Sequence, residues 1–199
     1  MKRIGVFGAS FNPPTVGHYD VIEQAAPFFD EILLVPSLSH PFLKQLESIE
    51  NRLAMLTRFV DNISDQNIKK CVKIFNIEAT LQKKLPPLSL IYTYDVLLET
   101  AHFYQTLSKP IQLRFIVGPD ISQFDVWQKF YRYKDIEKNW PLFIAKENQP
   151  IHSTQVRNCV LKYEHDKDAL LTALHPLVGE PIARYIIQHK LYQDRKGTL

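Results

Sequence analysis

Residues 4–36 decide the fold, and they read IGVFGASFNPPTVGHYDVIEQAAPFFDEILLVP. A short β-prone run over residues 4–7 ends at Gly8, and a proline-containing loop follows it. Residues 15–29 then carry apolar side chains at helical spacing, with Pro27 fraying the end, before a second apolar run over residues 32–35. A strand, a loop, a helix and a second strand in this order indicate a βαβ unit, whose two strands are parallel and joined by a right-handed crossover.

The alternation of strands and helices continues beyond this unit. Ser48 is placed to cap a helix that runs to residue 61, and residues 90–104 form an amphipathic helix. Strands are predicted around residues 72–77, 113–117 and 142–145. We expect helices from residue 154 onward, with Pro181 in the first turn of the last one. The predicted apolar stripe of the helix over residues 90–104 consists of Ile91, Tyr94, Leu98 and Ala101.

These elements predict an α/β fold with a doubly wound, Rossmann-like parallel sheet and a helical C-terminal part at roughly residues 153–199. The length of 199 residues suits a single domain spanning residues 1–199. With 45% hydrophobic and 23% charged residues, the composition is that of a globular protein rather than a disordered one.

Charge and hydropathy narrow the class of partner. The net charge is only +3 and the basic residues are scattered, so nucleic acid is not expected as a partner. No apolar stretch approaches the roughly 20 residues of a membrane span, and the apolar run after Arg3 is too short for the core of a signal peptide. Cys71 and Cys159 are far apart, which is typical of free thiols in a reducing compartment. We therefore expect a cytoplasmic protein without a membrane partner.

The loop between the first strand and the first helix, residues 8–18, is the first candidate for a ligand site. In an open parallel sheet, ligands bind beyond the carboxyl ends of the strands. Gly8 would let the backbone turn sharply and approach a ligand closely. Gly17 and His18 fall in the first helical turn, where free N–H groups and the helix dipole favour an anion. Thr15 and His18 are three residues apart, so they share one helix face and could grip the same phosphate group.

This loop matches neither of two common phosphate-binding fingerprints. It lacks the G-x-G-x-x-G pattern of dinucleotide sites, and it lacks the G-K-[ST] sequence of a P-loop. The alternative to a functional role is that His18 is an ordinary histidine at a helix N-terminus and that the prolines only stiffen a turn.

The tetrapeptide Thr15-Val16-Gly17-His18 resembles the (H/T)-x-G-H superfamily of nucleotidyltransferases, which attach AMP or CMP to a phosphate or a related nucleophile. Within that superfamily, residues 8–15 are most similar to the nicotinate and nicotinamide mononucleotide adenylyltransferases. The commoner bacterial form of this motif has Asp and His where this chain has Asn12 and Thr15. The resemblance covers nearly the whole chain, and it ends with a C-terminal helix pattern that includes Tyr192.

A second motif, HSTQVR at residues 152–157, resembles the Ile-Ser-Ser-Thr-x-x-Arg motif of the same family. His152 and Ser153 stand at the first two Ser-like positions of that motif. Ser153 or Thr154 would cap a helix and offer donors, and Arg157, one turn later, would point a planar fork of donors at the same anion. Taken alone, the motif is equally consistent with an ordinary helix cap followed by a solvated arginine.

The resemblance also implies roles for residues between the two motifs. Asp120 would accept hydrogen bonds from ribose hydroxyls, Lys44 would supply a cation to the mononucleotide phosphate, and Trp127 would stack on the pyridine ring. Arg52 matches a family position, with a plain surface charge as the alternative. The implied catalytic residues are Thr15, His18 and Arg157. The implied mononucleotide site consists of Asn12, Lys44, Tyr92, Thr93 and Trp127. The implied ATP site consists of Gly8, Ala9, Ser10, Phe11, Gly17, His18, Gly118, Asp120, Ser153, Thr154 and Arg157.

The reaction implied by the resemblance is an in-line attack of a pyridine mononucleotide phosphate on the α-phosphorus of ATP. It would yield a dinucleotide and pyrophosphate, as a step of NAD biosynthesis. Mg²⁺ would bridge phosphate oxygens and keep mostly water ligands, with no protein ligand expected. Two alternatives remain open at this point, a transferase of the phosphopantetheine type and a non-catalytic nucleotide sensor. The choice between nicotinate and nicotinamide, and whether the chain forms a homo-oligomer, are also open.

Overall fold

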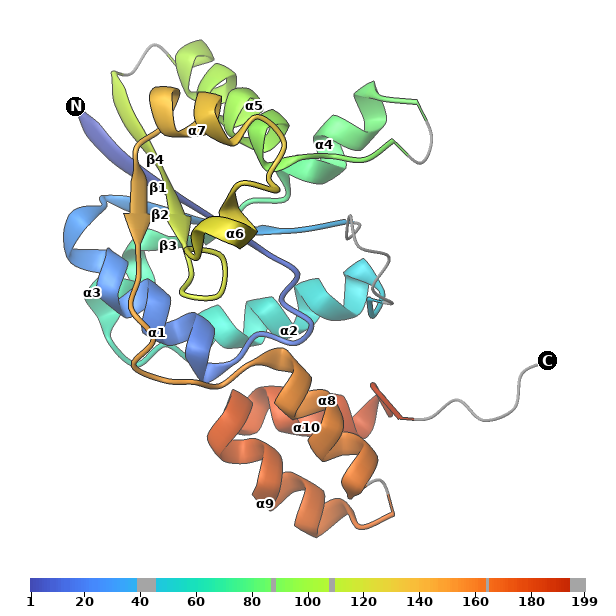
Figure 1. The fold of residues 1–199 in the computed structure, drawn as a ribbon. Helices are drawn as coiled ribbons and strands as arrows, with labels where there is room; N and C mark the ends of the chain where they lie inside the picture. The colour runs from blue at the N-terminus through green and yellow to red at the C-terminus, as the bar shows by residue number, and fades with distance from the viewer. Residues whose placement is uncertain (39–45, 87–88, 108–109, 164, 194–199) are drawn as a thin grey trace.

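A five-stranded parallel sheet forms the centre of the computed structural model (Figure 1), which describes residues 1–38, 46–86, 89–107, 110–163 and 165–193. The spatial order of the strands reverses between β1 and β4, which makes the sheet doubly wound and confirms the predicted fold class. At such a reversal a crevice opens beyond the carboxyl ends of the two strands. In spatial order the strands are β3 (Val72–Ile74), β2 (Glu31–Pro36), β1 (Lys2–Ala9), β4 (Ile111–Val117) and β5 (Leu142–Ile144).

Helices cover both faces of the sheet because successive side chains of each strand point to opposite sides. Ile32 and Leu34 pack into a core with α1 (Val16–Ala25), α2 (Ile49–Asp61) and α3 (Gln66–Cys71). Leu33 and Val35 belong to a second core on the other face. That second core is completed by α4 (Ile77–Lys84), α5 (Thr93–Thr106), α6 (Phe124–Trp127) and α7 (Tyr133–Asn139).

The C-terminal part of the chain consists of α8 (Ser153–Lys162), α9 (Lys167–Val178) and α10 (Glu180–Gln188), drawn in orange and red in Figure 1. These helices pack on the same side as α1 and α2, and Val156, Leu174 and Ile186 join the core formed by those helices. Pro181 lies in the first turn of α10, as predicted. The single-domain boundary of residues 1–199 stays a prediction.

No helix within the described ranges combines the length and the apolar character needed to cross a lipid bilayer.

The turn after β1 differs from the sequence-based expectation. The prediction of a sharp turn at Gly8 is wrong, because this residue lies inside β1 and pairs with Val35 of β2. The backbone instead turns at Phe11, which has a φ of 44° and a fully buried side chain. A cis peptide bond before Pro13 follows, and α1 then begins after its N-cap Thr15.

Two further expectations are corrected by the packing around α4 and α5. Ile77 does not extend β3, because it begins α4 and packs in the second core. The predicted stripe on α5 is wrong only at Leu98, which is exposed, because Ile91 is buried and Tyr94 and Ala101 pack against the second core. The helix also buries Val96, Leu97, Thr100 and Tyr104. Two polar side chains can occupy this buried face because each finds a partner: the Thr100 hydroxyl donates to the Val96 carbonyl at 2.7 Å and the Tyr104 hydroxyl to Glu31 at 2.7 Å.

Candidate active site

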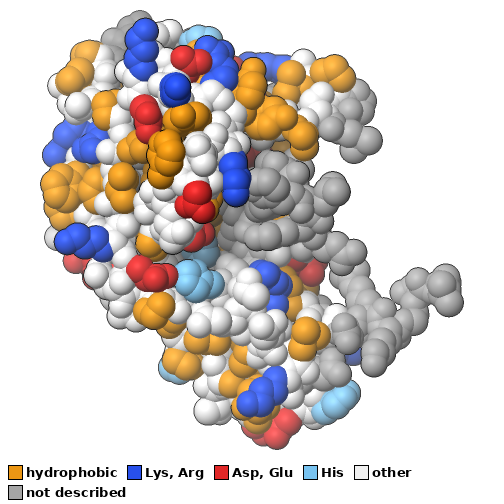
Figure 2. Space-filling view, viewed as in Figure 1, with side chains coloured by type: hydrophobic (Ala, Val, Ile, Leu, Met, Phe, Trp, Pro, Cys, Tyr) orange, Lys and Arg blue, Asp and Glu red, His pale blue; other side chains and the backbone are white. Residues whose placement is uncertain are grey.

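A cavity of about 780 Å³ lies at the carboxyl edge of the sheet, beside the point where the strand order reverses. Its walls come from the ends of β1, β2 and β4, the first turns of α1, α5 and α8, and the segment after β5. Figure 2 shows charged side chains of both signs and a histidine gathered on the surface where the C-terminal helices meet the rest of the molecule. Predicted site residues on the wall are Gly8, Ala9, Ser10, Asn12, Gly17, His18, Tyr92, Thr93, Gly118, Asp120, Ser153, Thr154 and Arg157.

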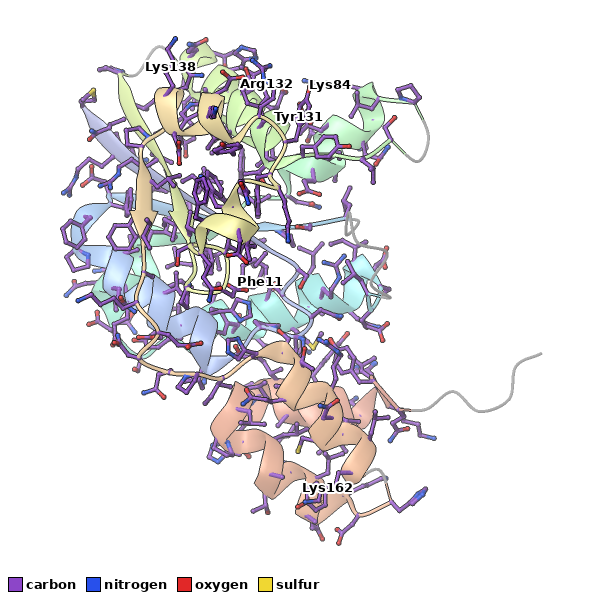
Figure 3. All side chains as sticks on the ribbon, in the orientation of Figure 1. Phe11, Lys84, Tyr131, Arg132, Lys138 and Lys162 are labelled. Carbon is purple, nitrogen blue, oxygen red and sulfur yellow. The ribbon has the colours of Figure 1, made fainter. Side chains whose placement is uncertain are left out.

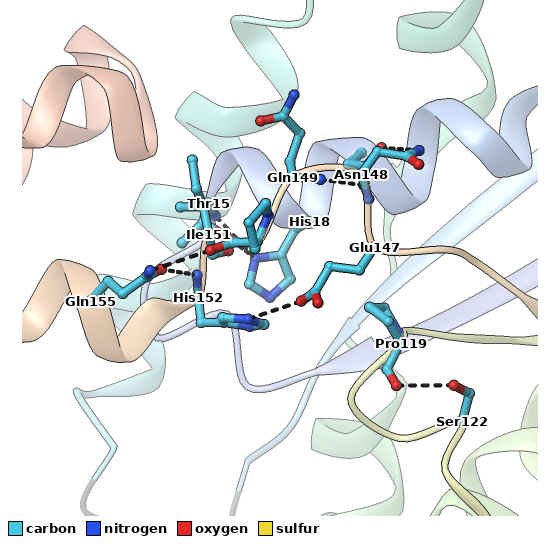
Figure 4. Close-up of polar contacts among 12 residues, drawn as sticks. Thr15, His18, Pro119, Ser122, Glu147, Asn148, Gln149, Ile151, His152 and Gln155 are labelled. Carbon is cyan, nitrogen blue, oxygen red and sulfur yellow. Dashed lines mark hydrogen bonds and ion pairs between the residues drawn. The ribbon is translucent and has the colours of Figure 1, made fainter.

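His18 presents one hydrogen-bond donor to this cavity. The backbone N–H of Thr15 donates to Nδ1 of His18 at 3.1 Å, so in the neutral ring the proton sits on Nε2 (Figure 4). Burial, with a smaller contribution from nearby His152, lowers the pKa of His18 to about 4. The imidazole is therefore uncharged near neutral pH, and its Nε2–H is a neutral donor.

Gly17 allows the chain after β5 to lie directly against the first turn of α1. A Cβ atom on Gly17 would lie 2.3 Å from the carbonyl oxygen of Ile151 and 3.2 Å from that of Gln149. The Thr15 hydroxyl lies 3.1 Å from the same Ile151 oxygen and 2.8 Å from Nδ1 of His18. The glycine of the first motif thus serves the contact with the second motif.

Hydrogen bonds also join the start of α8 to the loop after β1. The Ser153 hydroxyl donates to the Pro13 carbonyl at 2.7 Å, and Nη1 of Arg157 donates to the Asn12 carbonyl at 2.8 Å. Nη2 of Arg157 donates to the Thr154 hydroxyl at 2.9 Å. We call these contacts between residues 12–18 and 149–157 the clasp. It holds the N-termini of α1 and α8 at one cavity, where both helix dipoles favour an anion.

Arg52 organises the strand ends rather than acting as a surface charge. It is almost fully buried, and its Nη1 donates to the carbonyls of Ser10 at 2.8 Å and Ser37 at 2.6 Å. Its Nε donates to the carbonyl of Glu47 at 2.9 Å. The guanidinium therefore ties the chain after β1 to the chain after β2, which fixes the floor of the cavity.

Asn12 is held from two directions. Its Oδ1 accepts the backbone N–H of Glu47 at 3.1 Å and the hydroxyl of Tyr192 at 3.0 Å. The first donor identifies the amide oxygen, because a backbone N–H cannot pair with an NH₂ group. The C-terminal end of the described chain thereby reaches the loop that follows β1.

The structure does not bring three of the predicted site residues to the cavity wall. Thr15 and Phe11 are fully buried, and the Thr15 hydroxyl is used within the protein. Trp127 is also buried: its indole N–H donates to Glu137 at 2.7 Å, and its ring packs on Phe115. Their positions therefore do not support direct ligand contacts. Lys44 lies outside the described residues.

Several residues on the wall carry no sequence signal that we used. Phe130 and Tyr131 line the cavity beside Tyr92, whose ring centroid is 4.7 Å from that of Tyr131 (Tyr131 is labelled in Figure 3). We call Tyr92, Phe130 and Tyr131 the aromatic wall. Glu78 is buried at the edge of the cavity, accepts the N–H of Leu38 at 2.8 Å, and has its pKa raised to about 7 by burial.

His152 and Glu147 form a further pair on the wall. Nε2 of His152 lies 3.1 Å from Oε1 of Glu147 (Figure 4). Both side chains line the cavity and are part-exposed. The second motif includes His152 at a Ser-like position, whereas nothing in the sequence marks Glu147.

The fold and the site define a doubly wound α/β protein whose cavity is framed by two helix N-termini. The chain belongs to the cytidylyltransferase-like family, whose model matches residues 6–159.

Relatives and solved structures agree with this assignment. The chain is 27% identical over 202 residues to a Myxococcus xanthus protein assigned as a nicotinate-nucleotide adenylyltransferase, covering 96% of this chain and 94% of the other. It is 28% identical over 118 residues to phosphopantetheine adenylyltransferase of Clostridium novyi, covering 58% of this chain and 73% of the other. A Vibrio parahaemolyticus structure assigned as a nicotinate-nucleotide adenylyltransferase superposes with a TM-score of 0.74 at 25% identity, covering 98% of this chain and 97% of the other.

A solved structure of the Plasmodium falciparum nicotinic acid mononucleotide adenylyltransferase, complexed with NaAD, has the same fold. It superposes with a TM-score of 0.73 at 19% identity and covers 96% of this chain and 98% of the other.

Proposed function

We propose that this chain is an adenylyltransferase that transfers AMP from ATP to nicotinate mononucleotide, with nicotinamide mononucleotide as a second acceptor. The products are the corresponding dinucleotide and pyrophosphate, in NAD biosynthesis. The observation that carries the proposal is the clasp, which places two helix N-termini, His18 and Arg157 around one cavity. The similarity to relatives of this activity over 96% of the chain supports the choice of reaction.

The site suits a reaction that needs no general base. The attacking phosphate of the mononucleotide is already an anion, so catalysis consists of positioning and of stabilising charge around the α-phosphorus. A neutral Nε2–H of His18 donates to a phosphate oxygen without having to lose or gain a proton. Arg157 and the first turn of α8 face the remaining phosphates. Asp120, on the wall after β4, accepts from ribose hydroxyls.

Within the ranges that the structure describes, no three His, Cys, Asp or Glu side chains gather as a metal site. Mg²⁺ would instead enter on the phosphates of ATP and keep water ligands, as its coordination chemistry favours. When bound there, it would neutralise part of the phosphate charge. The residues of this chain then have to hold the nucleotide rather than the ion.

The aromatic wall is the proposed place for the pyridine ring. Flat rings recognise a flat, cationic ring through stacking and cation–π attraction. Tyr92 and Tyr131 lie on the cavity, whereas Trp127 is buried in the second core, where its ring packs against Phe130. Thr93, at the start of α5, and Asn12 complete this side of the proposed mononucleotide site.

Pyrophosphate release from MgATP tests this proposal, with nicotinate mononucleotide, nicotinamide mononucleotide and 4′-phosphopantetheine offered in parallel. We expect pyrophosphate release with the two pyridine mononucleotides and little with 4′-phosphopantetheine. The phosphopantetheine acceptor is included because a relative with that activity matches 58% of the chain. Release with this acceptor alone would replace the proposed substrate. ATP binding without release with any acceptor would indicate a nucleotide sensor.

A further inference from the structure

The side-chain amide of Asn12 is buried and has one fixed orientation. The residue is only 2% exposed, yet it lines the wall of the cavity. Its Oδ1 accepts the backbone N–H of Glu47 at 3.1 Å and the hydroxyl of Tyr192 at 3.0 Å. Both lone pairs of the amide oxygen are thereby occupied. The NH₂ group therefore has to point away from these two donors, because the two ends of an amide lie on opposite sides of its carbon atom.

The NH₂ group of Asn12 is open to the cavity. It carries two protons, and it donates neither of them to any of the described residues. Within the described part of the chain, the buried side-chain nitrogen or oxygen atom that lacks a partner is Nε of Arg114. The amide nitrogen of Asn12 is therefore not sealed inside the protein, and it reaches the cavity that the residue lines. A held donor of this kind is ready for an acceptor atom of a ligand.

The charges around Asn12 favour an anionic ligand group. Nη1 of Arg157 donates to the Asn12 carbonyl at 2.8 Å, and Nη1 of Arg52 donates to the carbonyl two residues earlier at 2.8 Å. Burial raises the pKa of the Tyr192 hydroxyl; Glu47 adds to this rise, whereas Arg157 and Arg52 oppose it. Two guanidinium groups and one carboxylate thus act on this corner of the cavity, and their sum attracts negative charge.

In the proposed reaction, the attacking phosphate of the mononucleotide is the group that matches this corner. Asn12 belongs to the clasp, which frames the place of the triphosphate, and it also lies on the mononucleotide side of the cavity. The attacking phosphate has to stand between these two places, next to the α-phosphorus. Its oxygens are anionic acceptors, which form strong hydrogen bonds with N–H donors.

The identity of residue 12 decides which kind of group faces the ligand. The commoner bacterial form of the first motif has Asp at this position. A carboxylate could accept from Glu47 and Tyr192 just as the amide oxygen does, but its second oxygen would then face the cavity as an acceptor. Asn12 offers donors in the same place. The donor is thus a property of this chain and not of the motif in general.

We propose that Tyr192 is a positioning residue for the acceptor substrate: together with the N–H of Glu47, its hydroxyl holds the Asn12 amide so that the NH₂ group donates to the phosphate of the mononucleotide. The inference rests on the proposed function for the identity of this substrate. Tyr192 itself is not on the cavity wall, so it acts through Asn12. The C-terminal end of the described chain therefore contributes to binding of a substrate that it does not touch.

Titration calorimetry in the absence of ATP tests the proposal, with nicotinate mononucleotide and nicotinate riboside as the two probes. These probes differ only in the phosphate. Asn12→Asp keeps an acceptor for both Glu47 and Tyr192 but replaces the NH₂ group by an anionic oxygen. We expect it to weaken mononucleotide binding by about tenfold or more, because a hydrogen bond to a charged group is lost. Binding of the riboside should stay close to that of the wild type.

Tyr192→Phe tests the positioning role directly. It should weaken mononucleotide binding roughly three- to tenfold, because the amide is held by one donor in place of two. In an Asn12→Ala background the same change should cause no further loss, since the two residues act as a unit. Tyr185→Phe is the matched control. It removes a hydroxyl that donates to Oδ1 of Asn51 at 2.8 Å, away from the cavity, and it should bind the mononucleotide like the wild type.

Three results would overturn the proposal: equal losses for the mononucleotide and the riboside, equal effects of the two tyrosine variants, or a wild-type protein that binds neither probe. The outcome is separable from that of the proposed function. If the binding pattern is as expected but MgATP yields no pyrophosphate with the mononucleotide, the proposed function fails while the role of Tyr192 stands. If pyrophosphate is released but the Asn12 and Tyr192 variants bind the mononucleotide like the wild type, the proposed function stands and this inference fails.

Discussion

The two sides of the cavity are built in different ways. On one side the clasp joins residues far apart in the sequence through backbone carbonyls and a glycine contact, as Gly17, Ser153 and Arg157 show. On the other side the aromatic wall holds its rings mainly by ring packing, with Tyr92 and Tyr131 4.7 Å apart between ring centroids and Phe130 packed on Trp127. The first side suits phosphate chemistry, which demands fixed geometry. The second suits recognition of a ring, which tolerates adjustment.

The largest expected effect comes from removing the neutral donor on the clasp side. His18→Ala should lower kcat by about 10²- to 10³-fold, because one preorganised donor to the reacting phosphates is lost. The KM for the mononucleotide should change much less. His102→Ala is the control. Steady-state pyrophosphate release measures both values, and full turnover of His18→Ala would show that this side of the cavity does not serve catalysis.

The next largest effect tests whether the clasp itself positions the site. Gly17→Ala places a methyl group 2.3 Å from the Ile151 carbonyl, which has to move. We expect about 1–3 kcal/mol less free energy of unfolding and a fall in kcat of about 10²-fold from misplaced groups. Gly8→Ala is the matched stability control, since its methyl group would meet only Phe115 at 3.9 Å. Chemical denaturation curves that coincide for the two variants would contradict the role of Gly17.

The aromatic wall should respond more weakly and only toward one substrate. Tyr131→Ala should raise the KM for the mononucleotide roughly five- to tenfold, the equivalent of one aromatic contact, while the KM for ATP stays unchanged. Phe124→Ala removes an exposed ring outside the cavity and should have no effect. Equal changes in both KM values would mean that the two sides of the cavity do not divide the substrates as proposed.

The smallest effect concerns Glu78, at the edge of the cavity. Its pKa is raised to about 7 in the folded state by burial, so the folded protein holds a proton that the unfolded chain releases at lower pH. Stability should therefore fall as pH rises from about 5 to about 7, by about 1–3 kcal/mol. Glu78→Gln should lack this component. Thermal unfolding of both proteins across that range measures the difference, and parallel curves would refute it.

The sequence predicted the sheet and the clasp side well, because both depend on local patterns. Alternating apolar runs placed the strands, and the two motifs placed His18, Ser153 and Arg157 on one cavity wall. The sequence did not show that the Thr15 hydroxyl donates to the Ile151 carbonyl within the protein, because Ile151 is distant in the chain.

The aromatic side was harder to predict. Burial decides whether a ring binds a ligand or fills the core, and a single sequence does not reveal burial. Trp127 therefore had a plausible stacking role, yet the structure buries it in the second core with its N–H bound to Glu137. Tyr131 lines the cavity, although it lies in a short connection between α6 and α7 with no periodic pattern.

The central claim is that the clasp holds ATP for attack at its α-phosphorus. The most direct measurement follows the label from ATP labelled at the α-phosphorus when nicotinate mononucleotide is the acceptor. We predict that the label appears in the dinucleotide, that unlabelled pyrophosphate is released in equal amount, and that His18→Ala suppresses both. Label in free AMP or ADP, or no consumption of ATP by the wild-type protein, would contradict the account.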